Sequence, residues 1–407
     1  MEELKTRCCI VGGGPAGMML GYLLARAGVE ALVLEKHGDF LRDFRGDTIH
    51  PSTLELLHEL GLLTEFLQRP HEEVRQITGW IGDSQVRIGD FTHLPTHCKF
   101  LAFMPQWDFL KFFADQAKRY ATFRLRMNTE ATDVLVEDGL VTGVLAKSGQ
   151  TQFVIRAGIT VAADGRHSVI RQKAGLEVIN LGAPMDVLWM RISRAESDPP
   201  MTLGRVDAGK ILVMLNRNAY WQCALVIPKG AYDEFRARGL PAFQAQLAQL
   251  APFLRDRVRE LSGWDQIKLL TVVVDRLKRW WRPGLLCIGD AAHAMSPIGG
   301  VGINLAIQDA VAAANILAKP LQTRSPDSRE LARVQERREF PTRATQRMQI
   351  LIQNNVIKRV FASSHIQAPW VLKLVDRWPL LQRIPARLVG IGFRPEHVRT
   401  PEVRSSQ

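Results

Sequence analysis

Residues 7–17 read RCCIVGGGPAG, an apolar run that passes directly into closely spaced glycines. The apolar run predicts a short buried strand, and the mostly apolar residues 18–27, followed by Gly28, predict a helix that packs on a sheet. A second apolar run at 31–34 predicts another strand and is followed by Glu35. A strand, spaced glycines, a helix, a second strand and an acidic residue in this order indicate a dinucleotide-binding βαβ unit.

Each glycine of this unit has its own task. Gly12 makes the tight turn, Gly14 lets backbone N–H groups approach a pyrophosphate, and Gly17 allows close contact between helix and strand. Glu35 is placed to accept hydrogen bonds from a ribose diol. The same unit predicts further cofactor-binding residues at Pro15, Ala16 and Lys36. This unit alone fits NAD and FAD equally, because both carry an adenosine ribose and a pyrophosphate.

Two later motifs choose between these dinucleotides. Residues 158–171 read GITVAADGRHSVIR, with Asp164 at the end of a predicted strand, and residues 285–309 read LLCIGDAAHAMSPIGGVGINLAIQD, with Asp290 in the same position. The pair resembles the DG and GD motifs of the single-component FAD-dependent aromatic hydroxylases, the para-hydroxybenzoate hydroxylase-like family. The similarity extends over roughly the first 320 residues.

The resemblance implies an α/β fold, with a Rossmann-like FAD-binding domain, an inserted β-sheet substrate domain and a C-terminal helical segment. We expect a discontinuous FAD-binding domain at 1–72, 100–180 and 268–340, a substrate domain at 73–99 and 181–267, and the helical segment at 341–407. Within the insert, strand-like runs at 187–192, 211–215 and 220–227 predict a sheet over the flavin.

The second motif carries groups that suit a flavin. The Asp290 carboxylate can accept hydrogen bonds from ribityl hydroxyls, and the glycine-rich turn after it can direct backbone N–H groups at the flavin edge that becomes negative on reduction. By resemblance, Pro297 contributes its carbonyl to the face where substrate lies. The flavin-binding residues that the resemblance implies here are Gly300, Gly302, Ile303 and Asn304. For His293 we prefer a structural role over an acid/base role.

Other positions match the family by resemblance. Arg45 corresponds to an arginine close to FAD and Gln106 to a glutamine whose amide contacts the cofactor; the alternatives are an exposed loop arginine and an ordinary first-turn residue of a helix at 106–119. The DG motif lies near the pyrophosphate in the family, so Arg166 and Arg171 either serve the cofactors or cap a helix end. Between Arg45 and Gln106, the residues Ser-Thr-Leu-Glu at 52–55 predict a capping box at the start of a helix.

The substrate side is less specific. The apolar strands of the insert suit an aromatic or polycyclic substrate. Arg217 and Tyr220, at the turn between two of those strands, are candidates together with Pro297 for catalysis or substrate contact, but a sheet-surface role is equally compatible with their positions. The sequence identifies no general base.

Composition excludes several classes. The chain has 407 residues, 46% of them hydrophobic and 23% charged, as in an ordinary globular protein. The net charge is +12, and residues 321–407 hold 16 Lys and Arg against 7 Asp and Glu. Most of the positive excess therefore lies in the C-terminal segment, and the first 320 residues are close to neutral. We therefore expect that the catalytic part does not bind nucleic acid. The Arg-rich C-terminal segment either docks on the flavin domain or makes a weak contact with an anionic membrane surface or partner.

The cysteines and the N-terminus point to the cytoplasm. Five cysteines without CxxC pairs argue against a metal site or a disulfide scaffold. The N-terminus has no secretory pattern, and no long uncharged apolar stretch is found, so we expect a cytoplasmic protein.

We therefore expect an FAD-dependent monooxygenase that uses NAD(P)H and O₂ to hydroxylate an aromatic or polyketide-like small molecule through a flavin C4a-hydroperoxide, as the resemblance implies. FAD is bound, and NAD(P)H docks transiently because no second GxGxxG follows a strand. The alternatives are a flavin-dependent halogenase or dehydrogenase on the same fold, or a non-catalytic flavin-binding interaction protein. The halogenase motif WxWxIP is not reproduced. A monomer and a homodimer are both compatible with the sequence.

Overall fold

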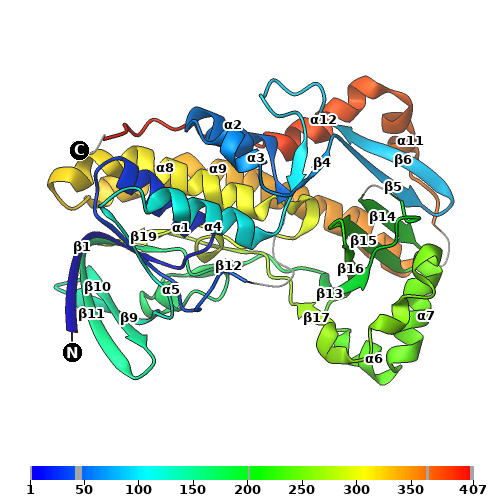
Figure 1. The fold of residues 1–407 in the computed structure, drawn as a ribbon, viewed down its shortest axis with the longest axis horizontal. Helices are drawn as coiled ribbons and strands as arrows, with labels where there is room; N and C mark the ends of the chain where they lie inside the picture. The colour runs from blue at the N-terminus through cyan, green and yellow to red at the C-terminus, as the bar shows by residue number, and fades with distance from the viewer. Residues whose placement is uncertain (1, 42–47, 200–201, 364–365, 404–407) are drawn as a thin grey trace.

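The computed structural model describes residues 2–41, 48–199, 202–363 and 366–403. Its largest sheet has the N-terminal strand in the middle (Figure 1). The strands follow one another in the order β19 (Trp281–Arg282), β20 (Leu285–Cys287), β11 (Thr151–Ala162), β1 (Glu2–Val11), β2 (Ala31–Leu34) and β8 (Phe123–Arg126). The hairpin of β9 (Glu130–Glu137) and β10 (Leu140–Ser148) extends from β11. We call this the main sheet.

Both faces of the main sheet are covered, which explains why β1 is apolar on consecutive residues. Cys8 and Ile10 pack on the helical layer, whereas Cys9 and Val11 pack on the opposite face, beneath the β9–β10 hairpin. The helical layer consists of α1 (Pro15–Arg26), α4 (Gln106–Ala117), α8 (Gly302–Thr323) and α9 (Ser328–Ile352).

The stretch Ile298–Thr323, which contains α8, is long and apolar enough to cross a membrane by length and composition. However, 78% of its most apolar window is buried inside the protein. Its side chains contact α1 and the main sheet, so this stretch is a core helix of the fold.

A second sheet lies beside the first and is mostly antiparallel. Its order is β17 (Lys268–Leu270), β13 (Met185–Ser193), β16 (Tyr220–Pro228), β15 (Lys210–Asn216), β14 (Leu203–Asp207), β5 (Gln76–Ile81) and β6 (Ser84–Asp90). One face, with Leu188 and Met190, is covered by α6 (Tyr232–Ala237) and α7 (Leu240–Leu250). The other face carries Val187 and Trp189. The predicted strands of the insert are thus confirmed as β13, β15 and β16, while the division into domains stays a prediction.

Smaller elements join the sheets. They are the sheet of β3 (Thr48–Ile49), β7 (Leu101–Phe103) and β4 (Glu72–Val74), the ribbon of β12 (Val178–Asn180) and β18 (Asp275–Leu277), and the helices α2 (Pro51–Glu59), α3 (Leu63–Leu67) and α5 (Val169–Lys173). After α9 the chain makes a π-helical turn, Gln353–Ile357, and then forms α10 (Lys358–Ala362), α11 (Trp370–Arg377) and α12 (Pro379–Gly390). Helices α11 and α12 lie against β6 at one end of the molecule (Figure 1).

The predicted capping box at 52–55 is wrong. Helix α2 starts at Pro51 with His50 as its N-cap, and no side chain caps it. The side chains that the motif would use have other partners: Thr53 donates its hydroxyl hydrogen bond to Asn304, and Glu55 accepts from His97. The pattern correctly predicted that a helix begins here, but Thr53 and Glu55 bind residues that are distant in the sequence instead of capping the helix.

Candidate active site

The carboxyl ends of four strands stop at the same level of the main sheet. In the parallel pairings, Val11 lies opposite both Leu34 and Ala162, and Ala162 lies opposite Cys287. The alignment continues past the strands, because the amide of Gly12 donates to the carbonyl of Leu34 at 2.8 Å. In open α/β sheets, ligands bind at this edge.

The predicted cofactor residues follow directly after these strand ends. Glu35 follows β2, Gly12 follows β1, Asp164 comes two residues after β11, and Asp290 comes three residues after β20. Three stretches that are far apart in the sequence therefore meet at one edge of the main sheet.

The glycines of the first motif differ in what surrounds them. A Cβ on Gly12, whose φ is +108°, would lie 2.3 Å from the carbonyl oxygen of Ala163, and a Cβ on Gly17 would lie 1.9 Å from that of Gly12. A Cβ on Gly14 would have no heavy atom of the described residues within 4 Å. The fold therefore fills the space beside two of the glycines and leaves the third open in front of α1, which begins at Pro15.

Glu35 is bound to the glycine loop itself. Its Oε2 accepts the amide hydrogen of Gly13 at 3.0 Å, and its Oε1 accepts that of His37, also at 3.0 Å. Lys36 lies exposed beside it. These contacts fix the carboxylate next to the turn, where a ribose attached to a bound pyrophosphate would lie; the ribose contact stays a prediction.

The DG and GD motifs are joined by an ion pair. A guanidinium nitrogen of Arg166 lies 3.4 Å from Oδ2 of Asp290, with both side chains 29% exposed. Oδ2 of Asp164 accepts the amide hydrogen of Ile170 at 3.3 Å, and burial raises the pKa of this carboxyl. Arg166 is thus at the candidate site.

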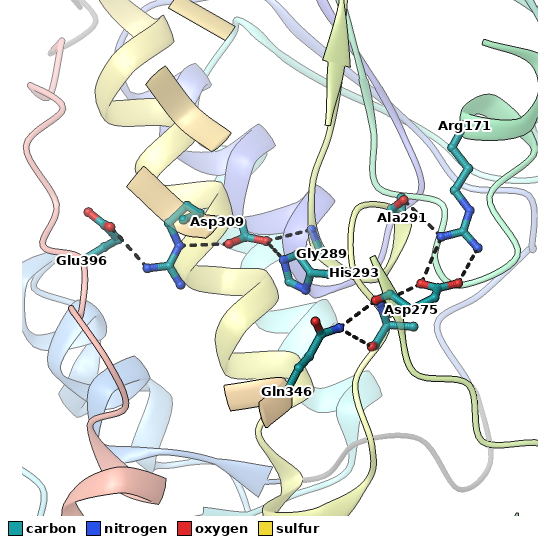
Figure 2. A network of polar contacts seen from close by, with 10 residues as sticks. Arg171, Asp275, Gly289, Ala291, His293, Asp309, Gln346 and Glu396 are labelled. Carbon is teal, nitrogen blue, oxygen red and sulfur yellow. Dashed lines mark hydrogen bonds and ion pairs between the residues drawn. The ribbon is translucent and has the colours of Figure 1, made fainter. Parts of the chain in front are cut away.

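Arg171, by contrast, points into the protein. Its guanidinium pairs with the buried Asp275 at 3.0 Å and donates to the carbonyl of Ala291 (Figure 2). It also donates to the carbonyl of Arg166 at 2.6 Å. Ser168 caps α5 by accepting the amide hydrogen of Arg171. These contacts are those of a structural arginine.

The GD loop is held by Asp309 of α8. Oδ2 of this carboxylate accepts the amide hydrogen of Gly289 at 3.0 Å and bonds Nε2 of His293 at 2.6 Å (Figure 2). A Cβ on Gly289 would lie 3.1 Å from Cβ of Ala306 and 3.2 Å from that of Ala16. The loop that carries Asp290 is therefore fixed between α1 and α8, and the contacts of His293 agree with the structural role expected of it.

The charge of Asp309 is balanced inside the protein. Nε of Arg338, on α9, donates to Oδ1 of Asp309 at 2.9 Å, and another nitrogen of Arg338 lies 3.3 Å from Glu396. Burial alone would raise the pKa of Asp309, but the neighbouring His293 and Arg338 outweigh it and hold that pKa below its ordinary value. Sequence reasoning missed this pair because its partners come from separate helices and share no motif.

Asn304, at the start of α8, uses its side chain to fasten another segment. Its Oδ1 accepts hydrogen bonds from the amide of His50 at 3.0 Å and the hydroxyl of Thr53 at 2.7 Å, and its Nδ2 donates to the carbonyl of Thr48 at 3.1 Å. The Asn304 side chain is therefore used within the protein, and the start of the helix can bind a ligand only through its backbone. The first N–H groups of a helix have no acceptor within the helix; here they belong to Gly302, Ile303 and Asn304.

His50 is a second residue that sequence reasoning missed. It is 1% exposed, and its Nδ1 donates to the carbonyl of Val389 on α12 at 2.6 Å. Burial lowers the pKa of His50 to about 4, against the raising effect of backbone carbonyls that include Gly299 and Gly300. The imidazole is therefore neutral at pH 7 and connects α12 to the glycine-rich turn.

Pro297 precedes the 3-10 turn Ile298–Gly300, and its carbonyl accepts the amide hydrogen of Gly300 at 3.1 Å. Ile298 packs in one apolar cluster with Trp189 and Val213 of the second sheet. The turn after Pro297 thus packs against the apolar side of that sheet, and the role of Pro297 on the substrate side stays a prediction.

Tyr220 lies elsewhere on the second sheet. The guanidinium of Arg191 stacks 3.9 Å over its ring, and both residues line a pocket of about 470 Å³. The other lining residues are Ser193, Ala219, Glu260, Gln266 and Lys268. None of them comes from the GD loop, so Tyr220 and Pro297 line different surfaces.

Arg217 belongs to a polar group at the end of β15. Its Nε donates to the side chain of Gln222 at 3.2 Å. The nearby Glu72 accepts a hydrogen bond from the Thr202 hydroxyl at 2.8 Å; burial raises its pKa, while Thr202 and Arg217 act in the opposite direction. Glu72 was not predicted, because nothing in its sequence neighbourhood shows that Arg217 lies close.

Two predicted cofactor residues remain. Gln106 is the first residue of α4, which packs on α1, and is half-buried. Arg45 lies outside the described residues. Within the described part of the chain, no group of three or more His, Cys, Asp or Glu side chains could hold a metal ion, and the five cysteines are buried and free.

Comparison with known proteins decides the family. A family model described as "FAD binding domain" matches residues 5–348. The chain is a member of this FAD-binding family. It is 31% identical over 405 residues to 6-methylpretetramide 4-monooxygenase of Streptomyces rimosus, covering 98% of this chain and 95% of that protein.

Solved structures share the fold. The structure of p-nitrophenol 4-monooxygenase from Pseudomonas putida matches with a TM-score of 0.77 and 19% identity, over 95% of this chain and 97% of that one. A myxobacterial chondrochloren halogenase matches with a TM-score of 0.74 and 19% identity, over 86% of this chain and 82% of that one. At this identity the likeness shows the fold alone.

These findings confirm the predicted family, the α/β fold, FAD as the cofactor and an FAD-dependent monooxygenase as the class of enzyme. The site of this FAD-binding protein also fits the cofactor on its own geometry, because no described atom fills the space beside Gly14 and the first N–H groups of α8 have no acceptor within the helix. The roles of the individual residues stay predictions.

Proposed function

We propose that this FAD-binding protein hydroxylates an aromatic or polyketide-like small molecule, with NAD(P)H as electron donor and O₂ as co-substrate. The observation that carries the proposal is that Ile298, in the turn after Pro297, packs against the same buried apolar cluster as Trp189 and Val213 of the second sheet. The turn immediately precedes α8, so an apolar substrate on this face would lie beside the flavin-binding edge. The relative that acts on 6-methylpretetramide, as its name states, supports a polycyclic substrate.

When bound, FAD would supply the redox chemistry of the reaction, in which NAD(P)H is oxidised, one oxygen atom of O₂ enters the substrate and the other becomes water. Residues of this chain would hold the cofactor. Gly12, Gly14 and the start of α1 would receive the pyrophosphate, Glu35 the ribose, and Asp290 the ribityl hydroxyls. Arg166 keeps the Asp290 carboxylate in place through their ion pair.

The backbone at the start of α8 would stabilise negative charge on the cofactor. The N–H groups of Gly302, Ile303 and Asn304 lie at the positive end of a 22-residue helix and would stabilise negative charge on the reduced flavin. Asn304 fastens residues 48–53 to this helix end. The donors are therefore held in position before the charge develops.

The second sheet provides the apolar side of the reaction space. Trp189, Val213 and Ile298 exclude water, which protects a reactive oxygen-transfer step from hydrolysis. Arg217 remains a candidate for contact with polar groups of the substrate, whereas Tyr220 lines the separate pocket with Arg191. We also propose a cytoplasmic enzyme, because all five cysteines are buried and free, and a monomer or homodimer as its assembly.

The test is turnover of the purified yellow protein with NADH and NADPH against phenols and tetracyclic polyketides. We expect at least one aromatic compound to accelerate NAD(P)H oxidation and to gain one oxygen atom, labelled when ¹⁸O₂ is supplied. A halogenated product in the presence of chloride or bromide would instead identify a halogenase. Protein that stays colourless after incubation with FAD, or that binds FAD but oxidises no NAD(P)H with any aromatic compound, would refute the proposal.

A further inference from the structure

Helices α11 and α12 present a run of large apolar side chains to solvent. We call this set the C-terminal apolar face; it consists of Trp370, Val371, Leu374, Trp378, Leu380 and Ile384, which are 75%, 47%, 42%, 56%, 64% and 57% exposed. Single exposed apolar residues are ordinary, but six on two consecutive helices and the residue that joins them form a concentrated patch. Trp370 and Leu374 lie four residues apart on α11, which places them on one helical stripe, and Trp378 is the residue between α11 and α12.

The two helices that carry this face are basic. Residues 370–390 contain four Lys and Arg and one acidic residue, Asp376. The Asp376 carboxylate is directed at β6, where it accepts the amide hydrogen of Arg87 at 2.8 Å. The exposed cations among and beside the apolar residues are Lys373, Arg377, Arg383 and Arg387.

The opposite side of α12 is anchored in the protein. Ala386 is fully buried, and a Cβ on Gly390 would lie 2.8 Å from Leu94 and 3.1 Å from Phe91. The carbonyl of Val389 accepts the hydrogen bond from His50. The helix is thus fixed by one side, and on the other side Leu380 and Ile384 stay more than half exposed within the described part of the chain.

We propose that the C-terminal apolar face binds the surface of a membrane that contains anionic phospholipids. Trp and Leu side chains enter the boundary between headgroups and acyl chains, where Trp is especially favoured, and the surrounding Lys and Arg pair with lipid phosphates. A second copy of this chain fits less well, because it would bring two faces of the same positive sign together. The contact is peripheral, since the apolar helix α8 is buried in the core.

The test is co-sedimentation of the FAD-loaded protein with vesicles of phosphatidylcholine, with or without about 30 mol% phosphatidylglycerol. We expect binding to the anionic vesicles and at least about tenfold weaker binding to the neutral ones or in about 0.5 M salt. Trp370→Ser combined with Leu380→Ser should weaken binding at least about tenfold. Arg377→Gln, Arg383→Gln and Arg387→Gln together should reduce the preference for anionic vesicles.

The matched control is Val136→Ser with Leu140→Ser. These residues are 45% and 46% exposed on the β9–β10 hairpin, at the opposite end of the molecule (Figure 1), and we expect wild-type binding. Bound FAD and the thermal transition should be unchanged in every variant, which separates loss of binding from loss of folding. The proposal is overturned if the wild type ignores anionic vesicles, if the apolar double variant binds as well as the control, or if light scattering shows a dimer that this double variant dissociates.

Discussion

The main sheet and the second sheet differ in the groups that they offer to the proposed ligands. At the edge of the main sheet the groups are mostly backbone, presented by Gly12, Gly14 and the start of α8 after strands that end in register. On the second sheet they are side chains on one face, such as Trp189 and Val213. Backbone sites need particular residues at fixed spacing and are visible in the sequence, whereas a face of side chains tolerates many sequences.

The largest expected effect separates two glycines of the same motif. Gly17→Ala places a methyl group 1.9 Å from the carbonyl oxygen of Gly12, so we expect little or no folded, yellow protein on expression. Gly14→Ala meets no described atom within 4 Å, so the fold should be stable to within about 1 kcal/mol while FAD affinity falls about 100-fold. Yield, thermal unfolding and FAD titration measure the pair. Unchanged FAD affinity in Gly14→Ala would show that the open space beside Gly14 is not the cofactor cradle.

The next effect tests the charge pair behind the main sheet. Asp309→Asn leaves Arg338 buried without its nearest carboxylate and should lower the free energy of unfolding by about 3–5 kcal/mol. The control, Asp133→Asn, breaks an ion pair with Lys173 at the surface and should change it by less than about 1 kcal/mol. Urea unfolding at pH 7 compares them, and equal effects would contradict the role given to the buried pair.

Acid titration sharpens the same test. The pKa of Asp309 is lower in the folded protein than in the unfolded chain, so its contribution is complete above the ordinary carboxyl pKa and is lost as the pH falls below about 4. Asp309→Asn should therefore have a flatter decline of stability in this acid range than the wild type.

A smaller effect concerns His50, which connects α12 to the glycine-rich turn. The folded pKa of about 4 lies below the ordinary value of 6.5, so the unfolded chain takes up a proton first and stability falls as the pH drops from 6.5 to 4. Between pH 7 and pH 5 this one group should account for about 2 kcal/mol. The measurement is urea unfolding at both pH values for the wild type and for His50→Gln. If His50→Gln loses as much stability between pH 7 and pH 5 as the wild type, His50 is not the cause of the loss.

The smallest effect is expected on the second sheet. Trp189→Ala should raise the KM of the aromatic substrate about tenfold, equivalent to about 1.4 kcal/mol, and leave FAD affinity unchanged. Tyr220→Phe should change KM by less than about threefold, because Tyr220 lines the separate pocket with Arg191. Steady-state kinetics measure KM, and FAD titration measures cofactor affinity. A loss of FAD binding in Trp189→Ala would contradict the assignment of FAD to the main sheet and of substrate to the second sheet.

The same distinction explains what the sequence could predict. The strands around Gly12, Asp164 and Asp290 were predicted because local residue patterns determine where each strand ends and turns. The pairing of Asp309 with Arg338 could not be, because it depends on how two helices are placed side by side. The capping box at 52–55 failed for a related reason: Asn304, more than two hundred residues later, takes the hydroxyl of Thr53.

The late position of Glu396 affects how the protein is made. Strand β1 is synthesised well before β20, with which the main sheet is extended, and Arg338 can meet Glu396 only later still. Until then a guanidinium that is buried in the folded protein lacks one of its two counter-charges. The buried charge cluster around Arg338 is therefore completed only after Glu396 has been translated.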